Sequence, residues 1–398
     1  MANDNGKKVS NVPALRFPGS SGEWESLRAS DLLECFSTNS LTWDELNFNE
    51  GKIKDLHYGL IHTAFDTSIV SCKSAAIPWI NKGREPKRYT SIKSGDLLLA
   101  DASEDTDEVG EPLELSDCDD TETVIAGLHT IHCRDKLNKT VPGFKAYLFQ
   151  SKRVRSQIEH LCQGSKIYSI SPSNLSEITV SIPGSKEEQE KIVSLLLSLE
   201  KRIEVQRKTI EDLDKLMGQI NDYLFNVLLR RANAKKYLSD LVDYHQPNKF
   251  IVKETEYGKS GIPVLTANKS FILGYTNEKQ GIFKGAEAIL LDDFTLDMKY
   301  VDFPFKVKSS ALKILVPKTG TNLSYVFCFL KSQHLKSNEH TRHYLSSVSS
   351  LWVPLPSTEM QGKVSELFSM LCKRKKQSNS ILKQLEKEKV SLINQLIL

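Results

Sequence analysis

The chain has 398 residues, of which 39% are hydrophobic and 26% charged, and its formal net charge at pH 7 is +3. This length predicts two or three domains, and the composition is typical of a globular protein rather than a disordered or fibrous one. The sequence contains no run of about 18 apolar residues and no apolar segment near its start of the kind that a secretory signal needs, so we expect a cytoplasmic protein without a membrane span.

Charged residues are distributed unevenly along the chain. Basic residues gather at 82–88, 151–155 and 373–376, whereas acidic residues gather at 101–123. A solvated loop or helix face is the ordinary explanation for any one such cluster. A site that combined several basic clusters would instead indicate an anionic partner such as a nucleic acid.

The first part of the chain predicts a domain of mixed helices and strands. Apolar runs typical of buried strands occur at residues 96–101 and 122–133. His129 and His132 lie in the second run, where alternation along a strand would direct them to opposite faces. We therefore expect structural roles for these two histidines rather than a metal site.

A long helix is predicted to begin near residue 185. Ser185 and Glu188 have the spacing of a capping box directly after Pro183. Apolar residues then recur at alternating intervals of four and three, which is the pattern of a coiled-coil seam. The seam comprises Ile192, Leu196, Leu199, Ile203, Ile210, Leu213, Met217, Ile220 and Leu224.

The second part of the chain repeats this order. Apolar runs at residues 288–293 and 311–317 predict strands, and Thr358 with Gln361 predicts the capping box of a second long helix. The seam of that helix comprises Val364, Phe368, Leu371, Leu382, Leu385, Leu392 and Leu396. Three polar residues fall in the same register, and we expect them to weaken the packing of this helix; they are Lys375, Ser378 and Lys389.

The two helices are copies of one another. Gln189 aligns with Gln361, Leu195 with Leu367, and Lys201-Arg202 with Lys373-Arg374. Similarity extends upstream into each globular segment but fades in the middle, which predicts a common scaffold with divergent surfaces. We expect an α/β fold with domains at 1–184 and 233–356, each followed by a long helix, at 185–232 and 357–398.

The sequence lacks the common catalytic motifs. It contains no G-x-x-x-x-G-K-[ST] phosphate loop, no G-x-S-x-G elbow and no H-E-x-x-H zinc motif. Its seven cysteines are scattered and never spaced C-x-x-C, so we expect reduced thiols rather than disulfides or a zinc site. Nothing in these patterns indicates an enzyme or a bound metal.

Several segments together resemble the specificity subunit of a Type I restriction-modification enzyme. They are PALRFPGSSGEWESLRASDLL near the start, GDLLLADASED with AGLHTIH in the first half, DDFTLDMKYVDFPFKVKSSALKIL in the second half, and the two helix entrances of the form P-x-x-x-E-x-Q-x-K-[IV]. Each segment alone is a weak signal, but their arrangement covers nearly the whole chain beyond the first dozen residues.

The resemblance implies two α/β target-recognition domains in a pseudo-repeat, separated by an antiparallel coiled coil of the two long helices. Each domain would recognise one half of a bipartite, asymmetric site in double-stranded DNA. The coiled coil would set the spacing and dock two modification subunits, which carry S-adenosylmethionine and methylate adenine. Restriction subunits would supply cleavage and translocation with ATP and magnesium. The chain itself would hold no cofactor and no catalytic residue.

Candidate DNA contacts follow from the chemistry of phosphate binding, which favours lysine and arginine beside aromatic side chains. In the first domain they are Lys82, Arg84, Lys87, Arg88 and Tyr89, and in the second they are Lys269, Lys299, Tyr300 and Lys308. For Tyr89 and Tyr300, half-buried packing is an equally good interpretation.

Two other functions remain open. The chain would serve equally as the specificity subunit of a Type IIB-like system with a fused nuclease-methylase partner. It would also fit a coiled-coil scaffold or adaptor without DNA binding, because its net charge is close to zero. Salt-dependent DNA binding separates the scaffold from the other two.

Overall fold

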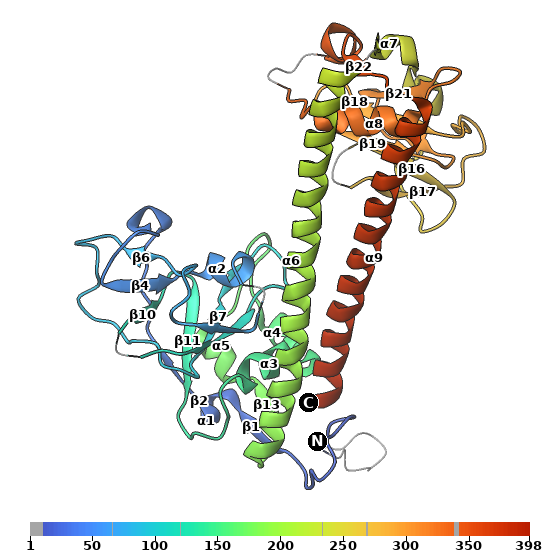
Figure 1. Ribbon diagram of the computed structural model, residues 1–398. Coiled ribbons are helices and arrows are strands. Elements are labelled where there is room, and N and C mark those ends of the chain that lie inside the picture. The colour runs from blue at the N-terminus through green and yellow to red at the C-terminus, as the bar shows by residue number, and fades with distance from the viewer. Residues whose placement is uncertain (1–10, 66, 120, 233, 268–269, 338–341) are drawn as a thin grey trace. The chain divides into compact units, whose positions relative to one another are not determined.

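The computed structural model describes residues 11–65, 67–119, 121–232, 234–267, 270–337 and 342–398. The chain divides into two compact units (Figure 1). Unit 1 comprises Met1–Lys208 and Ser380–Leu398, and unit 2 comprises Thr209–Asn379. Each unit thus includes part of both long helices. The α/β fold class expected from the sequence is confirmed.

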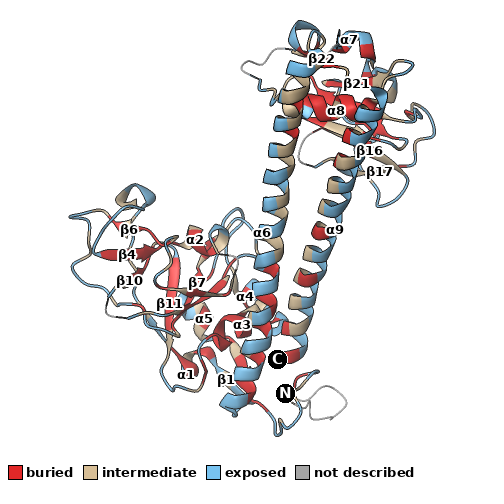
Figure 2. Ribbon diagram, in the orientation of Figure 1, coloured by how far each residue is buried: buried red, intermediate tan, exposed pale blue. Residues whose placement is uncertain are grey.

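Unit 1 is built around a five-stranded sheet in the order β2-β11-β7-β9-β5. The pairs are antiparallel except for β5 with β9. The strands are β2 (Leu33–Phe36), β5 (Ile69–Ser71), β7 (Leu97–Ala100), β9 (Pro112–Ser116) and β11 (Thr130–Asp135). Helices α3 (Phe144–Gln150) and α4 (Lys152–Leu161) pack against this sheet, and α3 is almost wholly buried (Figure 2).

A second sheet of unit 1 has the order β10-β4-β6-β3, with β4 parallel to β10. Its strands are β3 (Leu46–Asn47), β4 (Ile53–Leu56), β6 (Trp79–Ile80) and β10 (Thr123–Ala126). Two smaller pairs join β1 (Glu25–Arg28) to β13 (Thr179–Ile182) and β8 (Ala102–Ser103) to β12 (Tyr168–Ser169). The short helices are α1 (Ala29–Leu32), η1 (Trp43–Glu45), α2 (Tyr58–Thr63) and α5 (Pro172–Ser176).

Unit 2 repeats this plan with fewer strands. Its main sheet, β15-β21-β18-β19, is antiparallel throughout, and a second sheet has the order β17-β16-β20. The strands are β14 (Lys235–Tyr237), β15 (Val242–His245), β16 (Ile262–Leu265), β17 (Ile272–Thr276), β18 (Ala288–Asp292), β19 (Met298–Val301), β20 (Lys306–Val307), β21 (Leu312–Pro317) and β22 (Trp352–Pro354). The helices are α7 (Leu238–Leu241), η2 (Pro247–Phe250), α8 (Leu323–Ser332) and the π-helical η3 (Tyr344–Val348).

The two units share one topology. The pair β1 with β13 corresponds to β14 with β22, and the order β2-β11-β7 corresponds to β15-β21-β18. In each second sheet one pair is parallel, β4 with β10 in unit 1 and β16 with β20 in unit 2. The same loops therefore follow the same strands in both units, so their residues can be compared position by position.

The long helices are α6 (Lys186–Arg231) and α9 (Thr358–Leu396). Ser185 accepts a hydrogen bond from the Glu188 backbone, as a capping residue should, at 3.3 Å. The cap of α9 is Ser357, which accepts from Met360 at 3.3 Å, and not the expected Thr358. The expectation was wrong by one residue, because Ser357 precedes the helix whereas Thr358 is already its first residue.

Both helices contribute to the hydrophobic core of each unit. In unit 1, Ile192 and Leu196 of α6 join Leu392 and Leu396 of α9 in one cluster. Unit 2 has an equivalent cluster of its own. In it, Val364 and Phe368 of α9 join Ile220 and Leu224 of α6. Leu199, Ile203, Leu382 and Leu385 pack together further along unit 1. The remaining seam residues, Ile210, Leu213, Met217 and Leu371, are half-buried.

Two of the three polar residues of the second seam form ion pairs with α6. Lys389 Nζ lies 2.6 Å from Glu200 Oε1 in unit 1, and Lys375 Nζ lies 2.5 Å from Asp214 Oδ1 in unit 2. Ser378 is buried within the helix, which continues unbroken. A paired polar group in a seam fixes the register of two helices, because a shifted register would bury an unpaired charge.

Glu200 is the centre of this contact. Its side chain is 1% exposed and accepts hydrogen bonds from the Ser68 backbone and from the Tyr147 hydroxyl, both at 3.1 Å. Burial, together with the adjacent Glu200 carboxylate, raises the pKa of Tyr147, so its hydroxyl remains a donor. The ion pair with Lys389 thus ties α6, α9 and the globular part of unit 1 together.

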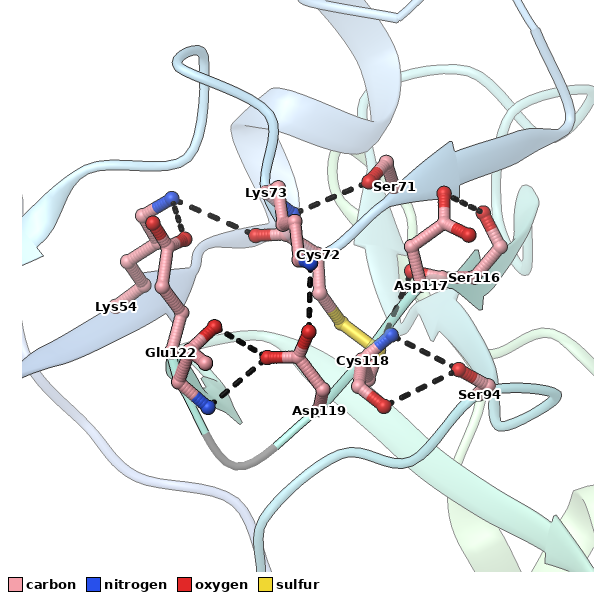
Figure 3. Close-up of polar contacts among 11 residues, drawn as sticks. Lys54, Ser71, Cys72, Lys73, Ser94, Ser116, Asp117, Cys118, Asp119 and Glu122 are labelled. Carbon is pink, nitrogen blue, oxygen red and sulfur yellow. Dashed lines mark hydrogen bonds and ion pairs between the residues drawn. A yellow bond between two sulfur atoms is a disulfide. The ribbon is translucent and has the colours of Figure 1, made fainter.

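Two cysteine pairs contradict the expectation of reduced thiols. Cys35 lies opposite Cys133 on paired strands and is bonded to it, and Cys72 is bonded to Cys118 (Figure 3). The pairing of β2 with β11 and of β5 with β9 brings these cysteines together. The spacing of cysteines along the sequence does not predict which strands pair, so the expectation failed. The free cysteines among the described residues are Cys162, Cys328 and Cys372.

The acidic segment beside Cys118 is partly neutralised by lysines. Asp119 Oδ2 lies 2.6 Å from Lys73 Nζ, and Glu122 pairs with the buried Lys54 (Figure 3). The hydrogen bond from Lys73 is the main reason that the pKa of Asp119 is well below its usual range. Lysine side chains therefore compensate part of the negative charge of the acidic cluster 101–123.

We predict that Lys389→Met lowers the free energy of unfolding by about 3 kcal/mol, because Glu200 would remain buried without its cation. The double variant Glu200→Gln, Lys389→Met should recover most of this loss, since Gln keeps an oxygen for Ser68 and Tyr147. Lys387→Met, at an exposed position of the same helix, is the control. Chemical denaturation measures all three, and equal stability of the single and double variants would contradict the pairing.

Candidate nucleic-acid interface

A basic loop of unit 1, residues 81–91, lies in the connection between β6 and β7. Its cationic side chains, Lys82, Arg84, Lys87 and Arg88, are all exposed, and Tyr89 is 47% exposed. The loop turns at Gly83, whose φ of 85° favours glycine and whose backbone donates to Glu85 at 2.8 Å. The five residues predicted from the sequence thus lie together on one solvent-facing loop.

This loop is held against the 3₁₀ helix η1. The backbone of Asn81 donates to Glu45 O at 2.8 Å, and its side chain donates to Asp44 O at 3.0 Å. Arg84 lies 3.7 Å from the Glu45 carboxylate. Backbone contacts therefore position the loop, while the other basic side chains remain available to a ligand.

The far end of the loop is fixed by Asp96 at the start of β7. Asp96 pairs with His132 at 2.8 Å and accepts from Arg134 Nε at 2.7 Å, and Arg134 also donates to Ser91 O at 3.1 Å. Burial favours the neutral carboxyl, but the hydrogen bonds from His132 and Arg134 outweigh it and lower the pKa of Asp96. His132 therefore has the structural role expected for it.

Unit 2 has a basic hollow at the corresponding place. Its loop 277–287 follows β17 as loop 81–91 follows β6, and packs on η2 as the first loop packs on η1. The hollow measures about 550 Å³, and three exposed lysines line it: Lys249, Lys253 and Lys279. We call this cavity, with its three exposed lysines, the basic hollow.

An ion pair at the base of the hollow supports it. Lys306 is 2% exposed, lies 2.7 Å from Glu278 Oε2 and donates to Gln280 O at 2.8 Å. The hydrogen bond from Lys306 lowers the pKa of Glu278 to about 2. The charge of the buried lysine is thus compensated, and the exposed charged side chains of the hollow are the three lysines and the carboxylate of Glu254.

The residues expected to bind DNA in the second domain are dispersed. Tyr300 donates to Glu287 and its ring lies 5.8 Å from that of Phe327, which matches the alternative of a half-buried packing residue. Lys299 is half-buried on β19, and Lys308 is exposed, with its Nζ 5.4 Å from the ring of Tyr257. Lys269 lies outside the described residues.

Sequence reasoning missed the basic hollow. A signal was present, because NEKQG at residues 277–281 follows a strand as NKGRE does at residues 81–85. The lysines of the hollow come from two separate segments, however, and only the fold brings them together. Among the described residues, no group of three or more metal-ligating side chains occurs, and no helix is long and apolar enough to cross a membrane.

Unit 1 contains a buried carboxylate next to the strand that leads into the basic loop. Asp55 on β4 is fully buried and accepts from Asn39 at 2.6 Å, but its second oxygen has no partner. Its backbone donates to Pro78, directly before β6 and the basic loop. Burial raises the pKa of Asp55 from 3.8 to about 7, although the Asn39 hydrogen bond opposes the shift.

The comparison with known proteins supports the resemblance. Residues 120–215 match the family model of the Type I restriction modification DNA specificity domain. This segment is therefore similar to a specificity domain of that kind, and the resemblance expected from the sequence is confirmed.

One protein to which this chain is similar in sequence is the specificity subunit of the Type I restriction enzyme EcoR124I/EcoR124II from Escherichia coli. It is 38% identical over 173 residues, which is 37% of this chain and 43% of that subunit. The match thus spans less than half of the relative's length.

The fold is similar to solved structures over nearly the whole chain. The S subunit of a Type I restriction-modification system from M. genitalium is 18% identical, with a TM-score of 0.59, over 97% of this chain and 99% of that one. A chain from a structure of the assembly and conformational transition of the type I R-M system is 14% identical, with a TM-score of 0.58, over 96% and 99%. These likenesses establish the fold.

We predict that Asp55→Asn changes how stability depends on pH. Because the folded pKa is raised, Asp55 favours folding below pH 4, and this contribution is lost as pH rises through about 7. The free energy of unfolding of Asp55→Asn relative to wild type should therefore rise by about 4 kcal/mol between pH 4 and pH 8. Denaturation across this range measures it, with the exposed Asp44→Asn as control; a difference independent of pH would contradict the account.

Proposed function

We propose that this chain is the non-catalytic DNA-recognition subunit of a Type I restriction-modification complex, in which each unit recognises one half of a bipartite, asymmetric site. The observation that carries the proposal is the repeated position of the basic groups. Loop 81–91 in unit 1 and loop 277–287, which contributes Lys279 to the basic hollow of unit 2, follow corresponding strands of one scaffold. Two such surfaces in one chain fit two separate contacts with one duplex.

The division between scaffold and surface fits sequence recognition. Lysine and arginine contacts with phosphate supply affinity without sequence information, whereas side chains that meet base edges supply specificity. A conserved topology would hold the phosphate contacts in place in both units. Different side chains beside them would then select two different half-sites.

The long helices have two further proposed roles. Helix α6 has 46 residues, which corresponds to about 69 Å at 1.5 Å per residue, and it contributes to both units. We propose that the paired helices set the spacing between the half-sites and dock two modification subunits. Those partners would bring S-adenosylmethionine, and restriction subunits would bring ATP and magnesium, because this sequence contains no motif for that chemistry.

Salt dependence tests the proposal against a scaffold that does not bind DNA. Replacing the cations of either surface with alanine should weaken binding to duplex DNA and make the dependence of log affinity on log salt shallower by about 0.9 per lost phosphate contact. The two variants replace Lys82, Arg84, Lys87 and Arg88 in unit 1, and Lys249, Lys253 and Lys279 in unit 2.

The matched control replaces the exposed basic cluster of α9, which comprises Lys373, Arg374 and Lys376. This variant removes three cations that belong to neither surface, so its salt slope should remain that of wild type. Wild-type slopes in both surface variants would contradict the assignment. No binding by the wild-type chain would favour the scaffold, and a neighbouring gene for a fused nuclease-methylase would favour the Type IIB-like system.

A further inference from the structure

Four rings form a row on unit 1 beside the basic loop. The centroids of Trp43 and His57 lie 4.5 Å apart, those of His57 and Tyr58 4.7 Å, and those of Tyr58 and His129 5.3 Å. The middle of the row is anchored, because His57 is only 2% exposed. Its two ends face solvent, since Trp43 is 44% exposed and the His129 side chain 50%.

His129 is held in a fixed orientation. Its φ of 55° places a residue other than glycine in the left-handed region, a conformation that costs free energy and persists where the surroundings impose it. Its Nδ1 lies 3.1 Å from Asp101 Oδ1. In the neutral tautomer whose Nδ1 donates to the Asp101 carboxylate, Nε2 is the hydrogen-bond acceptor.

The row begins where the basic loop is attached. Trp43 and Glu45 belong to the same 3₁₀ helix, η1, and Glu45 contacts both Asn81 and Arg84 of the loop. A duplex whose phosphates met the loop would therefore bring its base edges near the row. Trp43 of the row and Glu45, which contacts the loop, are the first and last residues of η1.

The far end of the row does not suit a phosphate. Glu104, Asp105 and Asp107 follow Asp101 in the chain and are exposed. Carboxylates repel phosphate but accept hydrogen bonds from the amino groups of bases. At this end a DNA ligand would present a base edge rather than its backbone.

At the corresponding described positions, unit 2 lacks the two histidines of the row. Thr266 follows β16 where His57 follows β4, and Ala311 precedes β21 where His129 precedes β11. Asp293, which follows β18 as Asp101 follows β7, accepts from backbone groups, including that of Tyr344 at 2.7 Å. The two units thus differ at a position next to their shared basic surfaces, where different half-sites would require a difference.

We propose that Trp43 and His129 are specificity-determining residues of unit 1. His129 Nε2 accepts a hydrogen bond from the exocyclic amino group of adenine or cytosine in the major groove, and Trp43 makes an apolar contact with a neighbouring base edge. This assignment rests on the proposed function, because it presupposes that unit 1 contacts DNA.

The test is selection of bound duplexes from a randomised pool by the full-length chain. His129→Asn keeps the left-handed backbone, which Asn tolerates, but its shorter amide does not reach the position of Nε2. We expect discrimination at one position of one half-site to fall about tenfold or more, with the other half-site and the gap unchanged. The position that relaxes identifies the base as adenine or cytosine.

Trp43→Ala should relax a second position in the same half-site, and His160→Ala, at an exposed histidine of α4, should change nothing. Thermal unfolding of each variant establishes that it is folded. A folded His129→Asn chain that selected the wild-type sequence at every position would overturn the assignment while leaving the proposed function intact. A wild-type chain that selected no sequence would overturn both.

Discussion

Neither unit of this protein completes its hydrophobic core without both long helices. Ile192 and Leu396 lie in one cluster of unit 1, and Val364 and Leu224 occupy the corresponding places in unit 2. A shift of one helix past the other by a whole heptad keeps apolar residues in the seam, so apolar burial does not by itself fix which residues meet. The buried pair of Glu200 and Lys389 supplies that register in unit 1, because any other alignment would leave a charge unpaired.

The repeat separates what must be the same in the two units from what differs. Strand order, the position of the 3₁₀ helices and the placement of cationic side chains beside them are shared. The ring row from Trp43 to His129 belongs to unit 1 alone among the residues compared. If the units contact DNA as proposed, surface substitutions would change one half-site while the core that both long helices complete stays the same.

The sequence predicted features that depend on local patterns. The seam from Ile192 to Leu224 follows from spacing, and the exposed loop at Lys82 follows from its run of charges and turn residues. Features that depend on long-range pairing were not predictable. Lys389 resembled a defect because its partner Glu200 lies in the other helix, Lys249 and Lys279 come together only through the fold, and Cys35 meets Cys133 only through strand register.

The central claim is that one chain recognises two different half-sites. Mapping methylated adenines by single-molecule sequencing, in cells with and without this chain, tests it most directly. The account predicts that one asymmetric sequence, with two specified parts separated by a fixed unspecified gap, loses its methylation when the chain is absent. A methylation pattern that is unchanged without the chain, or a lost sequence that is continuous or palindromic, would contradict it.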